Sequence, residues 1–398
     1  MQASIFVTDD ESAVRKALVK RLSRRQHQVR AFQSGDELLA ALEQDQPDLI
    51  LLDLKMPGMS GIEALKQLRT KARDAVVIIL TAYGTVEDAV EAMKLGAYDF
   101  LIKTVDLQGV EPVVDQAVEY LSLRRRVAYE AEHEAAQYGW SGLVTSSAPM
   151  NDLLAQVREV AQSPTTTVLL MGENGTGKEF LARVIHHNGA HATGPFVGIN
   201  CTSLPRERFE RELFGYERGA FAGADQRKLG LLEQAESGTL FLDEIGDLDL
   251  AMQSTLLHVL RDRSFHRAGG TEHMAVNARC IVATKRDIKK EVSEGRFRED
   301  LFVHLTASTC VLPPLRSRIE DMGPLSKRFM VKFGVKFGKD VVELDPGAIA
   351  VLNGYPFPGN VRELQNVIER AMMLCKGKTL TASDLPLEMR DVAVPVAL

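Results

Sequence analysis

The sequence predicts an α/β protein: a doubly wound sheet of five parallel strands, followed by a phosphate-loop α/β domain with a small α-helical lid. Three observations predict this. Short apolar runs alternate with amphipathic stretches over residues 1–105. The same alternation returns from residue 140 to about 315, and from about residue 320 the pattern is helical only. At 398 residues the chain has room for two or three domains.

The first part divides into elements at recognisable boundaries. Apolar runs predict strands at residues 4–8, 48–53, 75–80 and 98–102, with a weaker one over 27–32. Capping boxes predict the starts of three helices, at Ser34 with Glu37, Ser60 with Glu63, and Thr85 with Asp88. Gly96 is expected to end the helix before the last strand.

Residues 107–139 follow as a charged helical stretch, which we interpret as a linker helix. Its basic triplet, Arg124–Arg126, is either a nucleic-acid patch or the solvated face of the helix. The glutamates that follow favour the solvated face. Apolar side chains suit packing on a second copy as a dimeric coiled coil, and they are Val113, Val114, Ala117, Leu121 and Leu123.

Composition restricts the class of protein. Hydrophobic residues make up 45% and charged residues 26% of the chain, and the net charge of −6 gives no basic footprint for nucleic acid. No stretch approaches the roughly 20 apolar residues of a membrane span, and no secretory signal is visible. We therefore expect a cytoplasmic protein with no membrane partner. Its four cysteines lack metal-ligand spacing and are expected to be buried, reduced thiols.

Three carboxylates follow strands of the first sheet. Asp9 and Asp10 come after the first strand and Asp53 ends the third, so the three meet at the switch point of a doubly wound sheet. They would repel one another unless a cation lay among them, and oxygen-only ligands suit Mg²⁺. Asp53 is then a candidate nucleophile towards a phosphoryl donor.

Two later strand ends add to this site. Thr81 and Lys103 would supply a hydroxyl donor and a counter-charge to phosphoryl oxygens. In the alternative interpretation Asp9 and Asp10 only cap a helix and Lys103 lies on the surface. The occurrence of the whole set at strand ends favours the phosphoryl site.

Residues 1–120 resemble a response-regulator receiver domain in the motifs TDDE, DLKMPGMSG, LTAYG and GAYDFLIK. The resemblance implies that a sensor histidine kinase phosphorylates Asp53. It also implies that Asp10, Asp53 and the Lys55 carbonyl hold the metal, with Asp9 assisting, and that Phe100 is the switch aromatic. Thr104 stands where the family usually has proline.

A phosphate loop opens the second part. GENGTGKE follows an apolar strand and precedes a helix, a pattern in which glycine N–H groups and a lysine cradle ATP phosphates. Glu179 replaces the usual serine or threonine. The ATP-binding candidates are Gly172, Glu173, Asn174, Gly175, Thr176, Gly177, Lys178 and Glu179. A glycine turn without a ligand is the alternative.

A second motif, TLFLDE at 239–244, supplies the catalytic half of a nucleotide site. Asp243 at a strand end would organise Mg²⁺, and Glu244 would activate water. Two paired motifs in an α/β context are a stronger signal than a lone phosphate loop.

Residues 141–390 resemble the AAA+ domain of sigma-54 activators of the NtrC type. INCTSL, ELFGYERGAF, FHRAGG, RFREDLF, LPPLRSR and PGNVRELQN add to the two nucleotide motifs. The resemblance implies an α/β part at 140–315, a helical lid at 316–390 and a tail at 391–398. Asn200 would restrain Glu244, Arg298 would reach a neighbour's nucleotide, and Arg362 would contact phosphate. Shared sites imply a ring, commonly a hexamer.

The segment GYERGAFAGA, residues 215–224, is expected to be a finger with an exposed Phe221 that touches a partner. The partner-loop candidates are Gly219, Ala220, Phe221, Ala222, Gly223 and Ala224. In the resembled family this loop reads GAFTGA and engages the sigma factor through the threonine that Ala222 replaces. His304 stands at a second arginine position, and Lys285 replaces an asparagine.

These observations support two hypotheses. In the first, the chain is a phosphorylation-controlled AAA+ ATPase that acts on sigma-54 RNA polymerase. In the second it is a nucleotide-binding scaffold, or a sigma-54-independent regulator, because of Ala222 and His304. A metabolic kinase is a third, weaker idea, because no small-substrate pocket is evident. No helix-turn-helix follows Leu385, so direct DNA binding is not expected from this chain.

Overall fold

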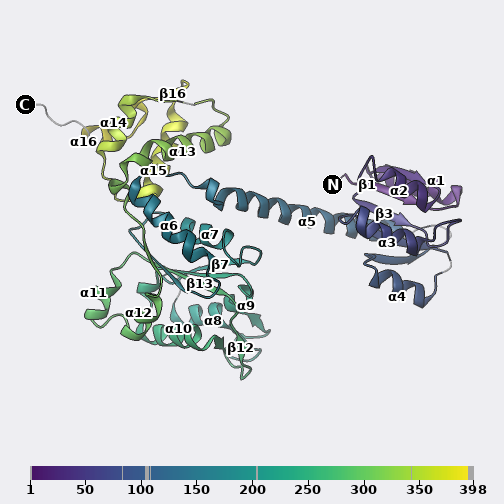
Figure 1. Cartoon of the computed structure of the whole chain (residues 1–398), viewed down its shortest axis with the longest axis horizontal. Coiled ribbons are helices and arrows are strands. Elements are labelled where there is room, and N and C mark those ends of the chain that lie inside the picture. The colour runs from purple at the N-terminus through teal and green to yellow at the C-terminus, as the bar shows by residue number, and fades with distance from the viewer. Residues whose placement is uncertain are drawn as a thin grey trace, which may run out of the picture. The chain divides into compact units, whose positions relative to one another are not determined.

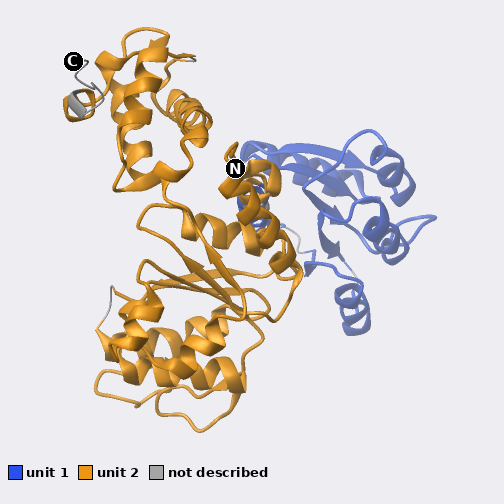
Figure 2. Cartoon of the chain, turned by 60° about the vertical axis from the view of Figure 1, so that its left-hand side comes forward, with its two compact units in different colours: residues 1–132 blue, residues 133–398 orange. Residues whose placement is uncertain are grey.

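The computed structural model describes residues 2–82, 84–103, 107, 109–202, 205–341 and 343–392. The chain forms two compact units, Met1–Glu132 and His133–Leu398, which Figure 2 distinguishes by colour. Among the described residues, none of the helices has both the length and the apolar character required to cross a membrane. All four cysteines are free and buried, as predicted.

The first unit is a doubly wound α/β domain. Its five strands are parallel and lie in the order β2-β1-β3-β4-β5, which confirms the predicted topology. The elements, most of them labelled in Figure 1, are β1 (Ser4–Thr8), α1 (Ser12–Arg24), β2 (Gln28–Phe32), α2 (Gly35–Ala41), β3 (Leu49–Leu52), α3 (Gly61–Lys71), β4 (Val76–Thr81), α4 (Val86–Lys94), β5 (Asp99–Ile102) and α5 (Val110–Tyr138).

Successive side chains of the central strands pack on opposite faces of this sheet. Ile50 and Leu52 belong to a core cluster with α2 and α3, whereas Leu49 and Leu51 belong to one with α1 and α5. Because both faces are covered, β3 is apolar throughout rather than alternating. The apolar run that predicted this strand therefore has a direct physical cause.

Local capping follows the predictions with one correction. Ser60 with Glu63 and Thr85 with Asp88 form complete capping boxes. At α2 only half of the box exists: Ser34 accepts from the Glu37 N–H, but the Glu37 carboxylate accepts from the Gln33 N–H instead. Gly96 follows α4 with φ +90°, a conformation that favours glycine.

The linker helix differs from the prediction in what its apolar side packs against. Val114, Ala117 and Leu121 are buried in the core beside α1, so these side chains pack on the chain's own sheet rather than on a second copy. Leu123 is half exposed. Periodicity shows that a helix has an apolar face but does not identify the surface that covers it.

The second unit opens with another parallel sheet, in the order β14-β6-β13-β10-β7. Its elements are α6 (Ala148–Gln162), β6 (Val168–Met171), α7 (Lys178–His187), β7 (Phe196–Asn200), α8 (Arg206–Phe214), β8 (Gly215–Tyr216), β9 (Lys228–Leu229), α9 (Leu231–Gln234), β10 (Thr239–Asp243), α10 (Leu250–Asp262), β11 (Ser264–Phe265), β12 (Met274–Ala275), β13 (Arg279–Thr284), α11 (Ile288–Ser293), α12 (Glu299–Leu305) and β14 (Thr309–Val311).

A mainly helical lid with its own apolar core follows. Its elements are α13 (Met322–Phe337), β15 (Glu343–Leu344), α14 (Pro346–Gly354), α15 (Asn360–Leu374), β16 (Thr379–Leu380) and α16 (Leu387–Val392). The predicted fold class, an α/β chain with a helical lid, is therefore confirmed.

Candidate functional sites

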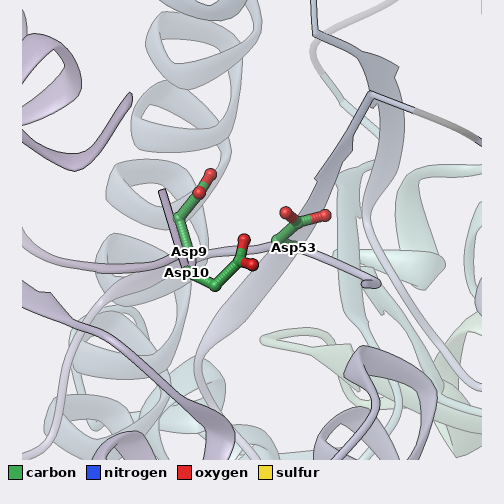
Figure 3. Close-up of side chains that lie close together, drawn as sticks. All are labelled: Asp9, Asp10 and Asp53. Carbon is green, nitrogen blue, oxygen red and sulfur yellow. The ribbon is translucent and has the colours of Figure 1, made fainter. Parts of the chain in front are cut away.

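The three predicted aspartates of the first unit lie together. β1 and β3 are parallel neighbours, so Asp9, Asp10 and Asp53 meet at one edge of the sheet. One carboxylate oxygen from each lies within 4.8 Å of the others, and Figure 3 shows the three side chains side by side. Asp9 and Asp53 are buried and Asp10 is half-buried.

Lys103 joins this cluster and is not a surface residue. Its Nζ lies 2.6 Å from Asp53 Oδ2 and 2.8 Å from Asp9 Oδ2. Burial raises the pKa of the Asp9 carboxyl group, although Lys103 opposes the rise. Burial alone would lower the pKa of Lys103, but its bonds to Asp53 and Asp9 outweigh burial and the pKa is raised. Three carboxylates against one ammonium leave negative charge, so this all-oxygen donor set fits Mg²⁺.

Thr81 and Phe100 lie next to each other at the same sheet edge. Thr81 ends β4 and is fully buried, and Phe100 in β5 is half-buried. A side chain at Gly84 would overlap the Phe100 ring and approach Thr81 Cγ2 to 2.8 Å, so glycine permits this close packing. Thr104, the departure from the receiver pattern, lies outside the described residues.

The phosphate loop connects β6 to α7. Gly172, Gly175 and Gly177 have φ values of +157°, +78° and +107°, which side chains rarely allow, and this explains the glycine spacing. Lys178 Nζ donates to the carbonyls of Gly172 at 2.8 Å and Glu173 at 3.3 Å. Burial lowers the pKa of Lys178, an effect that a bound phosphate would offset.

The second motif lies beside the loop. Glu244 Oε1 is 3.9 Å from Lys178 Nζ, and its Oε2 accepts from the Lys285 N–H at 3.1 Å. Burial and the neighbouring Glu244 raise the pKa of Asp243. Asp243 pairs in register with Asn200 on β7, whose Oδ1 accepts from Thr202. The structure therefore gathers Lys178, Asp243 and Glu244, with Asn200 on the adjacent strand.

The two predicted arginines have different surroundings. Arg298 precedes α12 and is forked onto Asp300, at 3.0 and 2.6 Å. Arg362 is an exposed residue in the first turn of α15, and its backbone N–H donates to the Gly175 carbonyl at 3.3 Å. The lid helix thus begins at the phosphate loop.

Sequence reasoning missed which residues hold the outer side of the loop. The Glu173 side chain, predicted to bind ATP, accepts from Arg316 and Asn360 of the lid segment. Arg318 donates to the Thr176 carbonyl. Both lid motifs were visible as LPPLRSR and PGNVRELQN, but no sequence pattern connects them to residues about 140 or more positions earlier.

Within the predicted finger, the Phe221 side chain packs against neighbouring residues, so the prediction of an exposed Phe221 was wrong. The Phe221 ring lies 4.9 Å from that of Tyr216, edge to face, and the Arg211 guanidinium covers it at 3.7 Å. Backbone bonds from Gly219 to Ala224 and from Ala224 to Phe221 close the loop. Ala222 and Gly223 are exposed at its tip.

Known families match all three parts of the chain. Residues 5–114 match the family described as response regulator receiver domain, residues 143–310 the sigma-54 interaction domain, and residues 316–395 the AAA+ ATPase lid domain.

Whole-length relatives agree with these matches. The chain is 40% identical over 387 residues to the regulatory protein AtoC of Escherichia coli (strain K12), covering 97% of this chain and 84% of that protein. It is 36% identical over 396 residues to the DNA-binding transcriptional regulator NtrC of Klebsiella pneumoniae, covering 99% and 83%. The crystal structure of NtrX from Brucella abortus in complex with ATP has a TM-score of 0.70 and 34% identity, covering 100% of this chain and 87% of that one.

The chain therefore belongs to the family of sigma-54-activating two-component response regulators, in which a receiver domain is joined to an AAA+ ATPase domain and its lid.

Proposed function

We propose that Asp53 is the phosphoacceptor of this regulator and that a sensor histidine kinase is the donor. A carboxylate oxygen of Asp53 forms the bond to phosphorus as the bond to the kinase histidine breaks. Asp9, Asp10, Asp53 and the Lys55 carbonyl would hold Mg²⁺, which offsets charge on the transferred group. Lys103 and Thr81 then bind the phosphoryl oxygens. The observation that carries this proposal is the carboxylate cluster with Lys103 inside it.

The second unit hydrolyses ATP in this proposal. Phosphate-loop N–H groups and Lys178 bind the triphosphate, Asp243 would hold Mg²⁺, and Glu244 accepts a proton from the attacking water. Asn200 restrains Glu244, and Arg362 contacts phosphate from the lid. Lys178 Nζ and Glu244 Oε1 lie 3.9 Å apart, and this proximity supports the assignment.

In this proposal the protein acts on its partner only after its subunits have assembled into an oligomer. Phosphorylation of the receiver, residues 1–120, acts through the linker at 107–139 on the ATPase at 140–315 and its lid at 316–390. The subunits form a hexamer-like ring in which Arg298 reaches a neighbour's nucleotide. Residues 219–224 contact sigma-54 RNA polymerase, which places the protein in the cytoplasm with that partner.

Phosphorylation is tested by labelling the full-length chain with radioactive acetyl phosphate and Mg²⁺. Wild type should take up label, and Asp53→Asn should not, because the amide is a poor nucleophile. Asp36→Asn, at an exposed position of the same unit, is the matched control and should label as wild type does. Equal labelling of Asp53→Asn and wild type would refute the assignment.

The scaffold alternative rests on Ala222 and His304 and predicts different kinetics. Steady-state ATP turnover should be at least 100-fold higher in wild type than in Glu244→Gln, because removal of a general base typically costs about 10²–10⁴-fold. Turnover no higher in wild type than in Glu244→Gln supports the scaffold. Open-complex formation by Ala222→Thr alone, and not by wild type, would remove sigma-54 polymerase as the native partner.

A further inference from the structure

The outer side of the phosphate loop is held by the lid. Asn360 Nδ2 donates to Glu173 Oε2 at 3.1 Å and to the Asn174 carbonyl at 3.0 Å. Arg316 forks onto the same Glu173 carboxylate at 2.7 and 2.5 Å. Arg318 Nη2 donates to the Thr176 carbonyl at 2.8 Å. We call Arg316, Arg318 and Asn360 the lid bracket.

The contact extends to the backbone. The N–H groups of Val361 and Arg362 donate to the Gly175 carbonyl, at 3.0 and 3.3 Å. A side chain at Gly175 would overlap the Gly359 carbonyl, so the close approach of α15 requires glycine at this position. Four successive loop residues, 173–176, are therefore each bound from the lid segments 316–318 and 360–362.

Asn360 is the buried anchor of the bracket. Its side chain is fully buried, its φ is +52°, and its Oδ1 accepts from the Leu315 N–H at 2.8 Å. It thus joins both lid segments to the loop. A non-glycine residue at positive φ is uncommon, and asparagine tolerates it better than most residues. Arg316 and Glu173 are nearly half exposed, so their ion pair should contribute less than the buried bonds of Asn360.

This arrangement affects the face that binds phosphate. A phosphate loop works when its N–H groups point towards the phosphate. Here the carbonyls of Gly172 and Glu173 accept from Lys178, whereas those of residues 174–176 accept from the lid. Buried carbonyls need donors, and for those three the lid supplies them. A loop already fixed in this shape does not lose conformational freedom when a ligand binds, so the affinity of the site for that ligand is higher. Arg316 and Asn360 also keep the Glu173 pKa low, at about 2, so this carboxylate is charged at neutral pH.

We propose that the lid bracket preorganises the phosphate loop, and that Glu173 and Asn360 are positioning residues for nucleotide binding that do not contact the nucleotide. This inference rests on the proposed ATP site. The same loop cradles the phosphates that ADP and ATP share, so the bracket strengthens both complexes by the same factor. Binding that is equal in the ground and transition states changes KM and leaves kcat unchanged.

The sharpest test is Asn360→Asp in the full-length chain. The substitution keeps the size of the side chain but turns an amide donor into a carboxylate that faces Glu173 and the Asn174 carbonyl. Fluorescent N-methylanthraniloyl ATP and ADP should each bind about tenfold more weakly, with kcat at saturating ATP within about twofold of wild type. Adding Glu173→Gln to the same chain should restore part of the affinity, because it removes one of the two facing charges.

A double-mutant cycle with Glu173→Ala and Arg316→Ala provides the second measurement. Each single variant should weaken the binding of both nucleotides. The double variant should bind no more weakly than the worse single variant, because the two side chains share one interaction. Lys336→Ala is the matched control: it breaks a lid ion pair with Glu369 that does not touch the loop, and its affinities should equal those of wild type.

Three outcomes would overturn the proposal. The first is unchanged affinity in a folded Asn360→Asp chain, and the second is a fall in kcat with affinity unchanged. The third outcome applies if Asn360→Asp does not fold, and it comes from the double-mutant cycle, because Arg316 is nearly half exposed and its removal leaves the core intact. If Glu173→Ala and Arg316→Ala then have strictly additive effects on nucleotide affinity, or no effect, the proposal is refuted. Failure of wild type to bind either nucleotide would refute the proposed ATP site itself, before any variant is compared.

Discussion

At the scale of single residues, Lys103 offsets part of the negative charge of the proposed phosphorylation site. Its side chain is 6% exposed, and its ammonium group binds two carboxylates whose side chains are also buried. Removing one partner of a buried ion pair is costly because the other charge is left without compensation. A divalent cation at the aspartates would then do part of the work of the lysine.

Lys103→Met should therefore destabilise the first unit by about 3–5 kcal/mol in EDTA, and millimolar Mg²⁺ should recover part of that loss. Thermal unfolding of the full-length chain, with and without Mg²⁺, measures both quantities. Lys94→Met, at an exposed position on α4, is the control and should leave the midpoint unchanged. A variant as stable as wild type in EDTA would contradict this account of Lys103.

His186 makes the second unit sensitive to acid. Its ring is buried in α7 with Nδ1 2.8 Å from Thr239 Oγ1, and burial lowers its pKa to about 4. An unfolded histidine titrates near pH 6.5, so the unfolded state binds the proton first as pH falls. The stabilisation is complete above pH 6.5 and is lost progressively towards pH 4.

Between pH 7 and pH 5 this histidine should lower the free energy of unfolding by about 2 kcal/mol. Urea unfolding of the full-length chain, followed at the transition of the second unit, tests the effect. His186→Asn should show a correspondingly smaller pH dependence, and His258→Asn, at an exposed histidine, should keep that of wild type. Identical pH dependence in His186→Asn would remove the assignment.

At the scale of elements, the β3–α3 connection positions Asp53. The Gly61 N–H donates to the Leu54 carbonyl at 2.9 Å, and a side chain at Gly61 would overlap the Asp53 carbonyl and approach Leu54 Cα to 2.6 Å. These atoms are backbone and cannot rotate away. The glycine thus permits the start of α3 to approach the backbone of Asp53, the proposed phosphoacceptor.

Gly61→Ala should cost about 1–3 kcal/mol through overpacking and should slow phosphorylation by displacing Asp53. Gly109→Ala is the matched control, because a side chain there meets nothing within 4 Å. Unfolding midpoints and initial labelling rates with acetyl phosphate check both variants. Normal stability and labelling in Gly61→Ala would show that α3 can shift without disturbing the site.

Elements also differ in how far their sequences predict them. β3 was predictable because burial on both faces requires an unbroken apolar run. The phosphate loop was predictable because three of its backbone positions have positive φ and need glycine. For α5 the helix was predictable but its partner was not, since Val114 and Leu121 would look the same facing their own sheet or a second chain. Phe221 was misjudged because its cover, Arg211, comes from a neighbouring helix.

At the scale of the whole molecule, the Arg298 guanidinium is bound to Asp300 of its own chain. In the proposed ring, Arg298 completes a neighbour's site. Lys178→Ala and Arg298→Ala should each lose turnover alone, whereas their equal mixture should recover about a quarter of the sites, because half of the intact loops meet intact arginines. ATP turnover of the mixture against each variant measures this.

A mixture of Lys178→Ala with Glu244→Gln is the control and should stay inactive, because both changes affect the loop-bearing side of a site. No recovery in the first mixture, at concentrations where wild type is active, would contradict an arginine supplied by a neighbour.

The sequence by itself determined two parallel sheets, the three clustered aspartates and the nucleotide motifs, because each depends on neighbours in the chain or on strand ends that one sheet must bring together. Only the tertiary structure decided that Lys103 lies between two carboxylates, that Phe221 is covered, and that the lid holds the phosphate loop through Glu173. Those contacts join residues from 10 to 187 positions apart, whose side chains carry no local signal of their partners. The physical reason is that short sequence patterns determine the local backbone conformation, whereas tertiary packing determines which partner a charged or aromatic side chain contacts.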